Sequence, residues 1–223
     1  VYITTPEINR DSASANVSVE VENTLAAPRQ VSVKAKIFSP DGKEISEASK
    51  NIEIPANSSA KADLKFDIKN PSPETPALYS AEVEVDSGNG AVDLQKETFG
   101  IRKIEFNPEN GFVLNGKKVL LKGVNLHHDL GALGAAVYDS ALERRIKFLK
   151  SMGVNHIRTA HNPYSKSLLD LADKYGILIT DEAFDKWSKW FVAGRKNSAD
   201  EVWPYVLEEF IKRDRNHPSV VIW

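Results

Sequence analysis

Two different hydrophobic patterns follow one another along this chain, and a single kind of secondary structure cannot produce both. In the first part, apolar residues occupy every second position, as Val17, Val19 and Val21 do. A period of two gives a β-strand one apolar face. Segments with this pattern are 16–23, 31–38, 61–68, 78–85 and 95–104. Turn-forming Pro, Asn and Gly residues separate them, which predicts an antiparallel β-sandwich of the immunoglobulin-like type.

After residue 117 the pattern changes to short apolar strands that alternate with amphipathic helices. The predicted strands are 118–125, 154–162, 177–183 and 219–223, and the predicted helices are 140–153, 165–176 and 198–216. Helix starts are indicated by a capping box of Ser140 with Glu143 and by N-caps at Ser165 and Ser198. A β-α-β-α-β-α-β order predicts a parallel sheet with right-handed crossovers. Four strands and three helices make half of a (β/α)₈ TIM barrel, or a short doubly wound sheet.

Residue composition divides the chain in the same way. The first hundred residues contain no Trp and no His, whereas eight of the eleven Pro lie before residue 110. We therefore predict an immunoglobulin-like β-sandwich domain over 1–104. Residues 105–223 are predicted to form the N-terminal half of a TIM-barrel domain, truncated after its fourth strand.

Charge and composition narrow the classes of function. The net charge of −2 argues against a general nucleic-acid binder, which needs a basic face. No apolar run reaches the length of a membrane span, so we expect no membrane partner. The chain has no Cys and therefore no disulfide framework, thiol nucleophile or cysteine metal site. Nothing in the composition indicates a cellular compartment.

Polar residues follow three of the four predicted parallel strands, where such folds carry their chemistry. They are Asn125, His127, His128 and Asp129 after the first strand, Arg158, His161 and Asn162 after the second, and Asp181 and Glu182 after the third. Imidazole, amide and carboxylate groups at one rim favour a polar, hydroxyl-rich ligand.

Each of these residues also has a structural interpretation. Arg158 and Glu182 can form an ion pair that braces the rim, one of the two adjacent histidines can serve the loop alone, and Asp129 can cap that loop. His156 and His217 are interpreted as structural.

Aromatic and metal-binding patterns leave similar alternatives. Trp187 and Trp190 can be core residues or a platform for a sugar ring. No HxH or HExxH spacing exists, so no metal site is predicted. Asp181 and Glu182 are neighbours on a strand and point to opposite faces. They therefore cannot act together as a facing acid/base and nucleophile pair of carboxylates.

Three segments together resemble a known family. They are "VLNGKKVLLKGVNLHHDLGALGAAV" (113–137), "IRTAHNPYSKSLLDLADKYGILITDEAFD" (157–185) and "RDRNHPSVVIW" (213–223). They resemble glycoside hydrolase family 2, the β-galactosidase, β-glucuronidase and β-mannosidase group, and the first is most similar to the β-galactosidase branch. "NPSPETPALYSAEV" (70–83) and "FGIRKIEF" (99–106) are similar to the end of that family's immunoglobulin-like domain and its connection to the barrel.

The resemblance implies a fragment without its catalytic residues. The family's fourth barrel strand continues as W-S-x-G-N-E, whose Glu is the acid/base, and the nucleophile Glu follows the seventh strand. Trp223 matches the Trp of that motif. We therefore expect both catalytic Glu residues to lie beyond this chain, with no catalytic residue, metal or cofactor within it.

The same resemblance implies a set of substrate-binding residues. His161 and Arg158 match the His and Arg of the family's R-x-S-H-Y-P motif, and Glu182 matches the Glu of its D-E-A/T segment. His128 and Asp129 match the H-x-D or H-E element after strand one. The expected sugar-binding residues are His128, Asp129, Arg158, His161, Asn162, Glu182 and Trp187. Ala160, Asn162 and the segment "DKW" (185–187) depart from the family pattern.

Two hypotheses on function follow. The chain is part of a retaining glycosidase that acts on terminal β-galactosides or related β-glycosides and is inactive by itself, or it is a non-catalytic carbohydrate-binding or interaction module. A half barrel also exposes unpaired strand edges, so we expect self-association through these edges.

Overall fold

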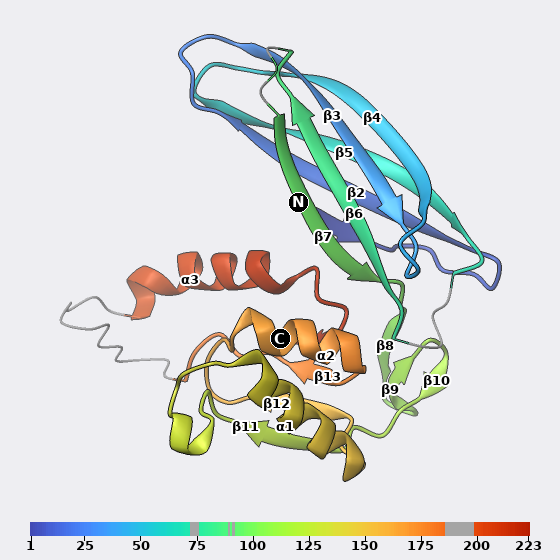
Figure 1. Ribbon diagram of the computed structural model, residues 1–223, viewed down its shortest axis with the longest axis vertical. Coiled ribbons are helices and arrows are strands. Elements are labelled where there is room, and N and C mark those ends of the chain that lie inside the picture. Colours follow the sequence, from blue (N-terminus) through green and yellow to red (C-terminus); the bar gives the residue numbers. More distant parts are fainter. Residues whose placement is uncertain (72–75, 89, 91, 186–198) are drawn as a thin grey trace. The chain divides into compact units, whose positions relative to one another are not determined.

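The computed structural model describes residues 1–223 except 72–75, 89, 91 and 186–198. The chain divides into two compact units, Val1–Lys103 and Ile104–Trp223 (Figure 1). No helix in the described residues is long and apolar enough to cross a membrane.

The first unit is a β-sandwich, as the period-two pattern predicts. One sheet has the order β1-β2-β5 and contains Tyr2–Thr4, Ser12–Asn23 and Ser58–Lys69. The other has the order β4-β3-β6-β7 and contains Glu44–Ile54, Arg29–Phe38, Leu78–Asp86 and Val92–Gly100. All pairs are antiparallel. Alternate residues such as Val17, Val33 and Ile68 fill the space between the sheets.

The sandwich contains a strand that the sequence pattern did not reveal. Strand β4 lies at the edge of its sheet, and among its residues only Ile52 and Ile54, near its end, are buried. An edge strand with few buried positions lacks the regular alternation on which the prediction depends.

The second unit opens with a small antiparallel sheet, β8 (Ile104–Asn107), β9 (Gly111–Leu114) and β10 (Lys117–Lys118). A four-stranded parallel sheet follows, made of β11 (Gly123–Leu126), β12 (His156–Thr159), β13 (Leu178–Thr180) and β14 (Val220–Ile222) in chain order. The helices between them are α1 (Asp139–Ser151), α2 (Lys166–Tyr175) and α3 (Ala199–Asp214). The parallel sheet and three helices confirm the partial TIM barrel.

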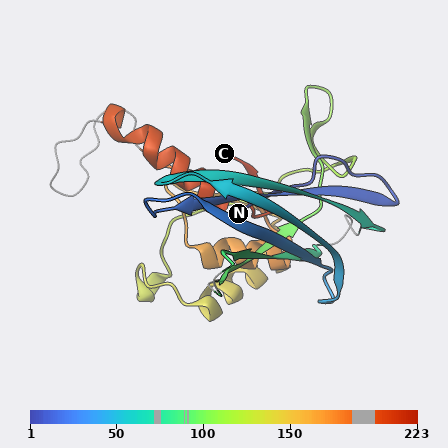
Figure 2. The ribbon, with the colours of Figure 1, turned by 90° about the horizontal axis from the view of Figure 1, so that it is seen from above.

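Helices α1 and α2 lie side by side and cover one face of the parallel sheet (Figures 1 and 2). Their buried Leu142, Ile146 and Leu168 pack against Ile157 and Ile179 of the sheet. Residues that alternate with these, such as His156 and Arg158, are only half-buried and belong to the opposite face. In a complete barrel that second face lines the interior.

One helix start is confirmed and one is wrong. Ser165 caps α2, because its Oγ accepts a hydrogen bond from Leu168 N at 3.4 Å. The capping box at Ser140 is absent, since α1 begins at Asp139 after an N-cap at Tyr138 that makes no side-chain cap hydrogen bond. Glu143 instead accepts a hydrogen bond from the Tyr175 hydroxyl and lies 3.2 Å from Lys174 Nζ. The predicted Ser198 cap lies outside the described residues.

The predicted strand 118–125 is also wrong in part, because β11 begins only at Gly123 and the Leu120 side chain is exposed. The Asn155 side chain holds this segment in another conformation. Its Nδ2 donates to Leu120 O at 2.9 Å, and its Oδ1 accepts from Lys122 N at 2.7 Å. These hydrogen bonds replace strand pairing for residues 120–122.

A buried histidine fixes the approach to β14. His217 Nδ1 and Asp173 Oδ2 of α2 are 2.6 Å apart, and Ser219 N donates to Asp173 Oδ1 at 2.8 Å. Both residues are about 5% exposed or less. These contacts agree with the structural interpretation of His217. Through them, Asp173 joins helix α2 to the turn before β14.

The outer strands of the parallel sheet lead to the first prediction. Strands β11 and β14 each pair on one side only among the described residues. We expect the average mass by light scattering to rise with protein concentration, since unpaired apolar edges associate. The substitution Ile222→Lys should suppress this rise because it places a charge on the β14 edge. The matched control is Phe148→Lys, which removes an exposed apolar side chain of α1 away from the edge. A monomer at every concentration, or equal suppression by Phe148→Lys, would contradict the prediction.

Candidate functional site

Three of the predicted ligand-binding residues meet at the carboxyl ends of β12 and β13. Arg158 Nε donates to Glu182 Oε1 at 2.5 Å, and Arg158 Nη2 lies 3.3 Å from His161 Nδ1. His161 Nδ1 is also 3.4 Å from Glu182 Oε2. Parallel pairing of the two strands accounts for this cluster, since it aligns Arg158 with Thr180, two residues before Glu182. The ion pair that the structural interpretation suggested is therefore present, and it also holds a histidine.

The cluster remains open to solvent. The side chains of Arg158, His161 and Glu182 are 37%, 41% and 22% exposed. Such a partly hydrated ion pair contributes roughly 1 kcal/mol or less to stability. Its main effect is to orient the groups, because Glu182 holds the Arg158 guanidinium, which contacts the imidazole at Nδ1. In the tautomer that accepts the Arg158 N–H at Nδ1, the ring proton is on Nε2, and that nitrogen is then a hydrogen-bond donor.

Of the two adjacent histidines, His127 is the one beside this cluster. Its ring centroid lies 5.4 Å from that of His161 in an edge-on arrangement. The His128 ring packs instead on Tyr164, with centroids 4.7 Å apart, and its Nδ1 is buried without a hydrogen-bond partner among the described residues. The family pattern selected His128, and alternation along the strand did not decide which ring points to the site.

Asp129 contacts the loop and helix α1. Its backbone oxygen accepts from Arg145 Nη1 at 2.6 Å, and its carboxylate lies 3.8 Å from Arg145 Nη2. Gly131 N donates to Asp129 Oδ1 at 3.3 Å, which is the loop cap that the alternative interpretation describes. Asn162 is exposed, and Trp187 and Trp190 lie outside the described residues. The structure thus brings together Arg158, His161 and Glu182, but places His128 and Asp129 with other partners.

A threonine that the sequence analysis missed fixes the backbone of the site. Thr159 Oγ1 donates to Asp181 Oδ1 at 2.9 Å and accepts from Glu182 N at 3.1 Å. This hydroxyl therefore ties the end of β12 to both residues that follow β13. The one sequence signal for Thr159 was its position directly after Arg158, which places it on the opposite face of the strand.

Asp181 and Glu182 do point to opposite sides, as alternation requires. Asp181 is fully buried on the helix side, near Asp214 at the end of α3. Burial and, secondarily, the Asp214 carboxylate raise the pKa of Asp181 to about 7. Arg213 compensates Asp214 through hydrogen bonds of 2.7 and 2.5 Å to its two oxygens. Asp181 is therefore a structural acid that holds its proton near neutral pH.

A possible metal ligand set lies away from this rim. Ligand atoms of Asp170, Asp173 and His217 lie within 4.8 Å of one another. The hydrogen bonds of Asp173 to His217 and Ser219 N already use both of its oxygens. These contacts fit a structural role, and we assign no metal to the group.

Two family models match the chain. "Glycosyl hydrolases family 2" matches residues 1–102, and "Glycosyl hydrolases family 2, TIM barrel domain" matches residues 106–223. A β-galactosidase of Bacteroides ovatus is 35% identical over all of this chain and 27% of its own length. A β-glucuronidase of Streptococcus agalactiae is 35% identical over 66% of the chain and 26% of its own length.

Solved structures show the same fold over the whole chain. A glycosyl hydrolase family 2 member from Bacteroides cellulosilyticus superposes with a TM-score of 0.90 at 34% identity and is covered over 30% of its length. A β-glycosidase from Bacteroides vulgatus gives 0.86 at 36% identity and is covered over 28%. The chain thus spans less than a third of the length of these relatives.

The buried acid leads to a prediction on stability. In the folded state Asp181 keeps its proton up to about pH 7, whereas its ordinary pKa is 3.8. Its stabilising contribution is therefore complete below about pH 4 and is lost as the pH rises through 7. Asp181→Asn, which mimics the neutral acid, should flatten this dependence and stabilise the second unit at pH 8 by roughly 1–3 kcal/mol.

Urea unfolding at pH 5 and pH 8, followed by tryptophan fluorescence, measures this effect. All four tryptophans lie in the second unit, so the signal reports that unit alone. The matched control is Glu209→Gln, which neutralises an exposed acid on the same helix as Asp214. A variant that keeps the pH dependence of the parent would refute the assignment.

Proposed function

Because the chain belongs to glycosyl hydrolase family 2, we propose that it forms part of a retaining glycosidase that acts on terminal β-galactosides or related β-glycosides. The observation that carries this proposal is the cluster of Arg158, Glu182 and His161 at the carboxyl ends of two adjacent parallel strands. Relatives named β-galactosidase and β-glucuronidase both support a terminal β-linked sugar as the substrate class.

His161 is proposed to donate a hydrogen bond to a sugar hydroxyl. Its Nδ1 accepts from Arg158 Nη2 in the tautomer with the proton on Nε2, and its side chain remains 41% exposed. The Nε2–H group is then held in one direction without loss of rotamer freedom on binding. His127, which packs edge-on against this ring, limits its movement on the other side.

The 223 residues are proposed to have no glycosidase activity of their own. Retention requires an acid/base carboxylate and a nucleophile roughly 5 Å apart across the scissile bond. At the described rim, Glu182 is held by Arg158 and Asp181 is buried on the other side of the strand. This chain would therefore contribute sugar binding, while the catalytic carboxylates belong to the remainder of a longer enzyme.

A chromogenic β-galactoside tests the absence of activity. We expect no release of nitrophenol above the buffer rate from the purified chain at pH 7, since no suitably spaced pair of free carboxylates is available at the described rim. A nitrophenyl β-glucuronide should give the same result. Turnover of either substrate that scales with protein concentration would overturn this part of the proposal.

Sugar binding is tested separately by NMR. Galactose at millimolar concentration should shift backbone amide signals of residues 158–162 and 181–182, because half a pocket binds weakly but at a defined place. His161→Ala should abolish the shifts, whereas Asn162→Ala, an exposed change on the same loop, should retain most of them. The absence of shifts at millimolar galactose would contradict sugar binding by this chain and would favour a purely structural fragment.

A further inference from the structure

Strand β11 ends just before the first of the two adjacent histidines. The last pair of its ladder with β12 joins Leu126 to Thr159. His127 is therefore the first residue outside this ladder, and strand pairing does not determine where its ring points. Yet that ring lies edge-on to the His161 ring, with centroids 5.4 Å apart. A contact outside the ladder is needed to hold the His127 backbone in this position.

The buried tyrosine Tyr164 supplies such a contact. It is 2% exposed, and its hydroxyl donates to His127 O at 3.0 Å. Arg145 Nη1 of α1 lies 3.5 Å from the same hydroxyl oxygen. A guanidinium only donates hydrogen bonds, so the hydroxyl accepts from Arg145 and directs its own proton to His127. Burial raises the pKa of the Tyr164 phenol, which keeps this proton in place at neutral pH.

The other contacts of Tyr164 hold it firmly in the fold. Its ring packs on the His128 ring, with centroids 4.7 Å apart. Its backbone oxygen accepts from Arg213 Nη2 of α3 at 3.0 Å. The His127 carbonyl oxygen also accepts from Asp129 N at 2.7 Å, so both of its lone pairs are used. The first residue after β11 is thus fixed by a tyrosine from another loop and by its own turn.

We propose that Tyr164 is a positioning residue that holds His127 beside His161, so that the two rings are already ordered when a sugar binds. This inference rests on the proposed function of the rim in sugar binding. His161 and Tyr164 are three residues apart on one short loop, so the hydroxyl fixes His127 relative to His161 and not only relative to the sheet. Two ordered rings lose less side-chain freedom on binding than two rings that move independently.

A role in the core alone requires only the Tyr164 ring. That ring belongs to the apolar cluster that contains Ile157 and Leu168, and phenylalanine would fill the same space. The hydroxyl instead contacts polar groups of Arg145 and His127. The substitution Tyr164→Phe therefore separates the two roles, because it keeps the ring and removes the hydroxyl.

NMR of the histidine rings tests the positioning without any sugar. The ring current of His127 shifts the ring-proton signals of His161, and His127→Ala gives these signals without that contribution. Tyr164→Phe should move the His161 signals toward those of His127→Ala, since His127 is no longer held. The matched control is Tyr175→Phe, which removes the hydroxyl that donates to Glu143 and should leave the signals unchanged. Unchanged His161 signals in Tyr164→Phe would overturn the proposal.

A second variant covers the case in which Tyr164→Phe loses cooperative unfolding in urea. Without the guanidinium in Arg145→Gln, the Tyr164 hydroxyl is no longer directed to His127, so the His161 signals should again move. Signals equal to those of the parent would contradict the positioning role in the same way.

A galactose titration tests the consequence for binding. At a galactose concentration below saturation, the amide shifts of residues 158–162 should be about fivefold smaller in Tyr164→Phe than in the parent, because one hydrogen bond that orders the site is lost. Tyr175→Phe should behave as the parent does. Equal shifts in Tyr164→Phe and the parent would overturn the link between positioning and binding. No shifts in the parent would contradict the proposed function of the rim, and the His161 ring signals would still decide the position of His127.

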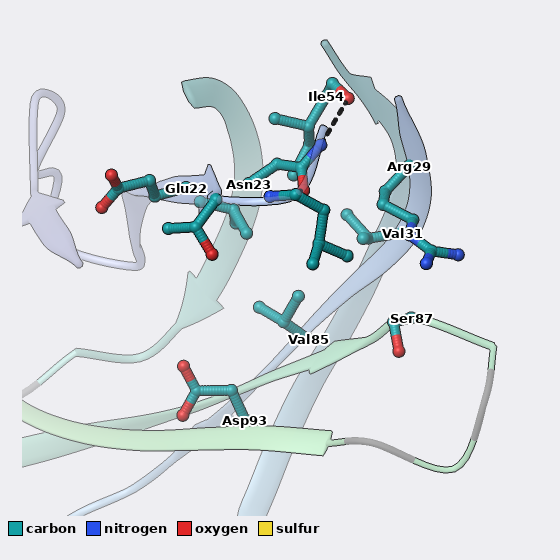
Figure 3. Close-up of a pocket in the computed structure, with 11 residues that line it drawn as sticks. Glu22, Asn23, Arg29, Val31, Ile54, Val85, Ser87 and Asp93 are labelled. Carbon is teal, nitrogen blue, oxygen red and sulfur yellow. Dashed lines mark hydrogen bonds between the residues drawn. The ribbon is translucent and has the colours of Figure 1, made fainter. Parts of the chain in front are cut away.

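Sugar bound elsewhere would give a distinct result. The first unit contains a cavity of about 570 Å³ whose lining includes Asn23, Ser87 and Asp93 (Figure 3). Amide shifts near these three residues, with none at the rim, would place galactose in the first unit. That outcome would overturn the link between Tyr164 and sugar binding.

Discussion

The rim of the second unit depends on the Thr159 hydroxyl and in particular on its hydrogen bonds to the two residues that follow Thr180. One is donated to the Asp181 carboxyl and the other is accepted from the Glu182 backbone. Since both partners follow β13 and Thr159 ends β12, these bonds fix where the chain leaves the sheet. Arg158 and Glu182, on the opposite face, then reach each other across the strand ends. A hydroxyl can donate one hydrogen bond and accept another at the same time, so Thr159 can hold both residues at a buried position. Each buried polar atom left without a partner would cost about 1–3 kcal/mol.

The strand alternation at this rim separates two acids into different environments. Asp181 is directed toward the helices, where burial and, secondarily, the nearby Asp214 raise its pKa to about 7. Glu182 is directed to the solvent side, where Arg158 supplies a positive charge. Two adjacent carboxyl groups thus lie in opposite environments, one buried and one partly exposed to solvent. This difference follows from the alternation of side chains along an extended chain and requires no special backbone geometry.

The sequence predicted the features that depend on periodicity and missed those that depend on single side chains. Alternation located β2, β3, β5 and β6, and the helix–strand repeat gave the parallel sheet, because both patterns reflect burial over many residues. Local hydrogen bonds were less predictable. Ser165 caps its helix but Ser140 does not, and Asn155 holds residues 120–122 out of the predicted strand. These outcomes depend on partners far apart in the sequence, which a local pattern does not contain.

The candidate site shows the same division. Arg158, His161 and Glu182 were predicted from strand ends and from family resemblance, and they lie together. The resemblance selected His128, whereas His127 is the one beside His161, and alternation did not decide between them because it ends where the loop begins. Thr159, Tyr164 and Arg145 act through positions that only the fold brings together. A motif therefore identified the residues at the rim, while the contacts that orient them required the structure.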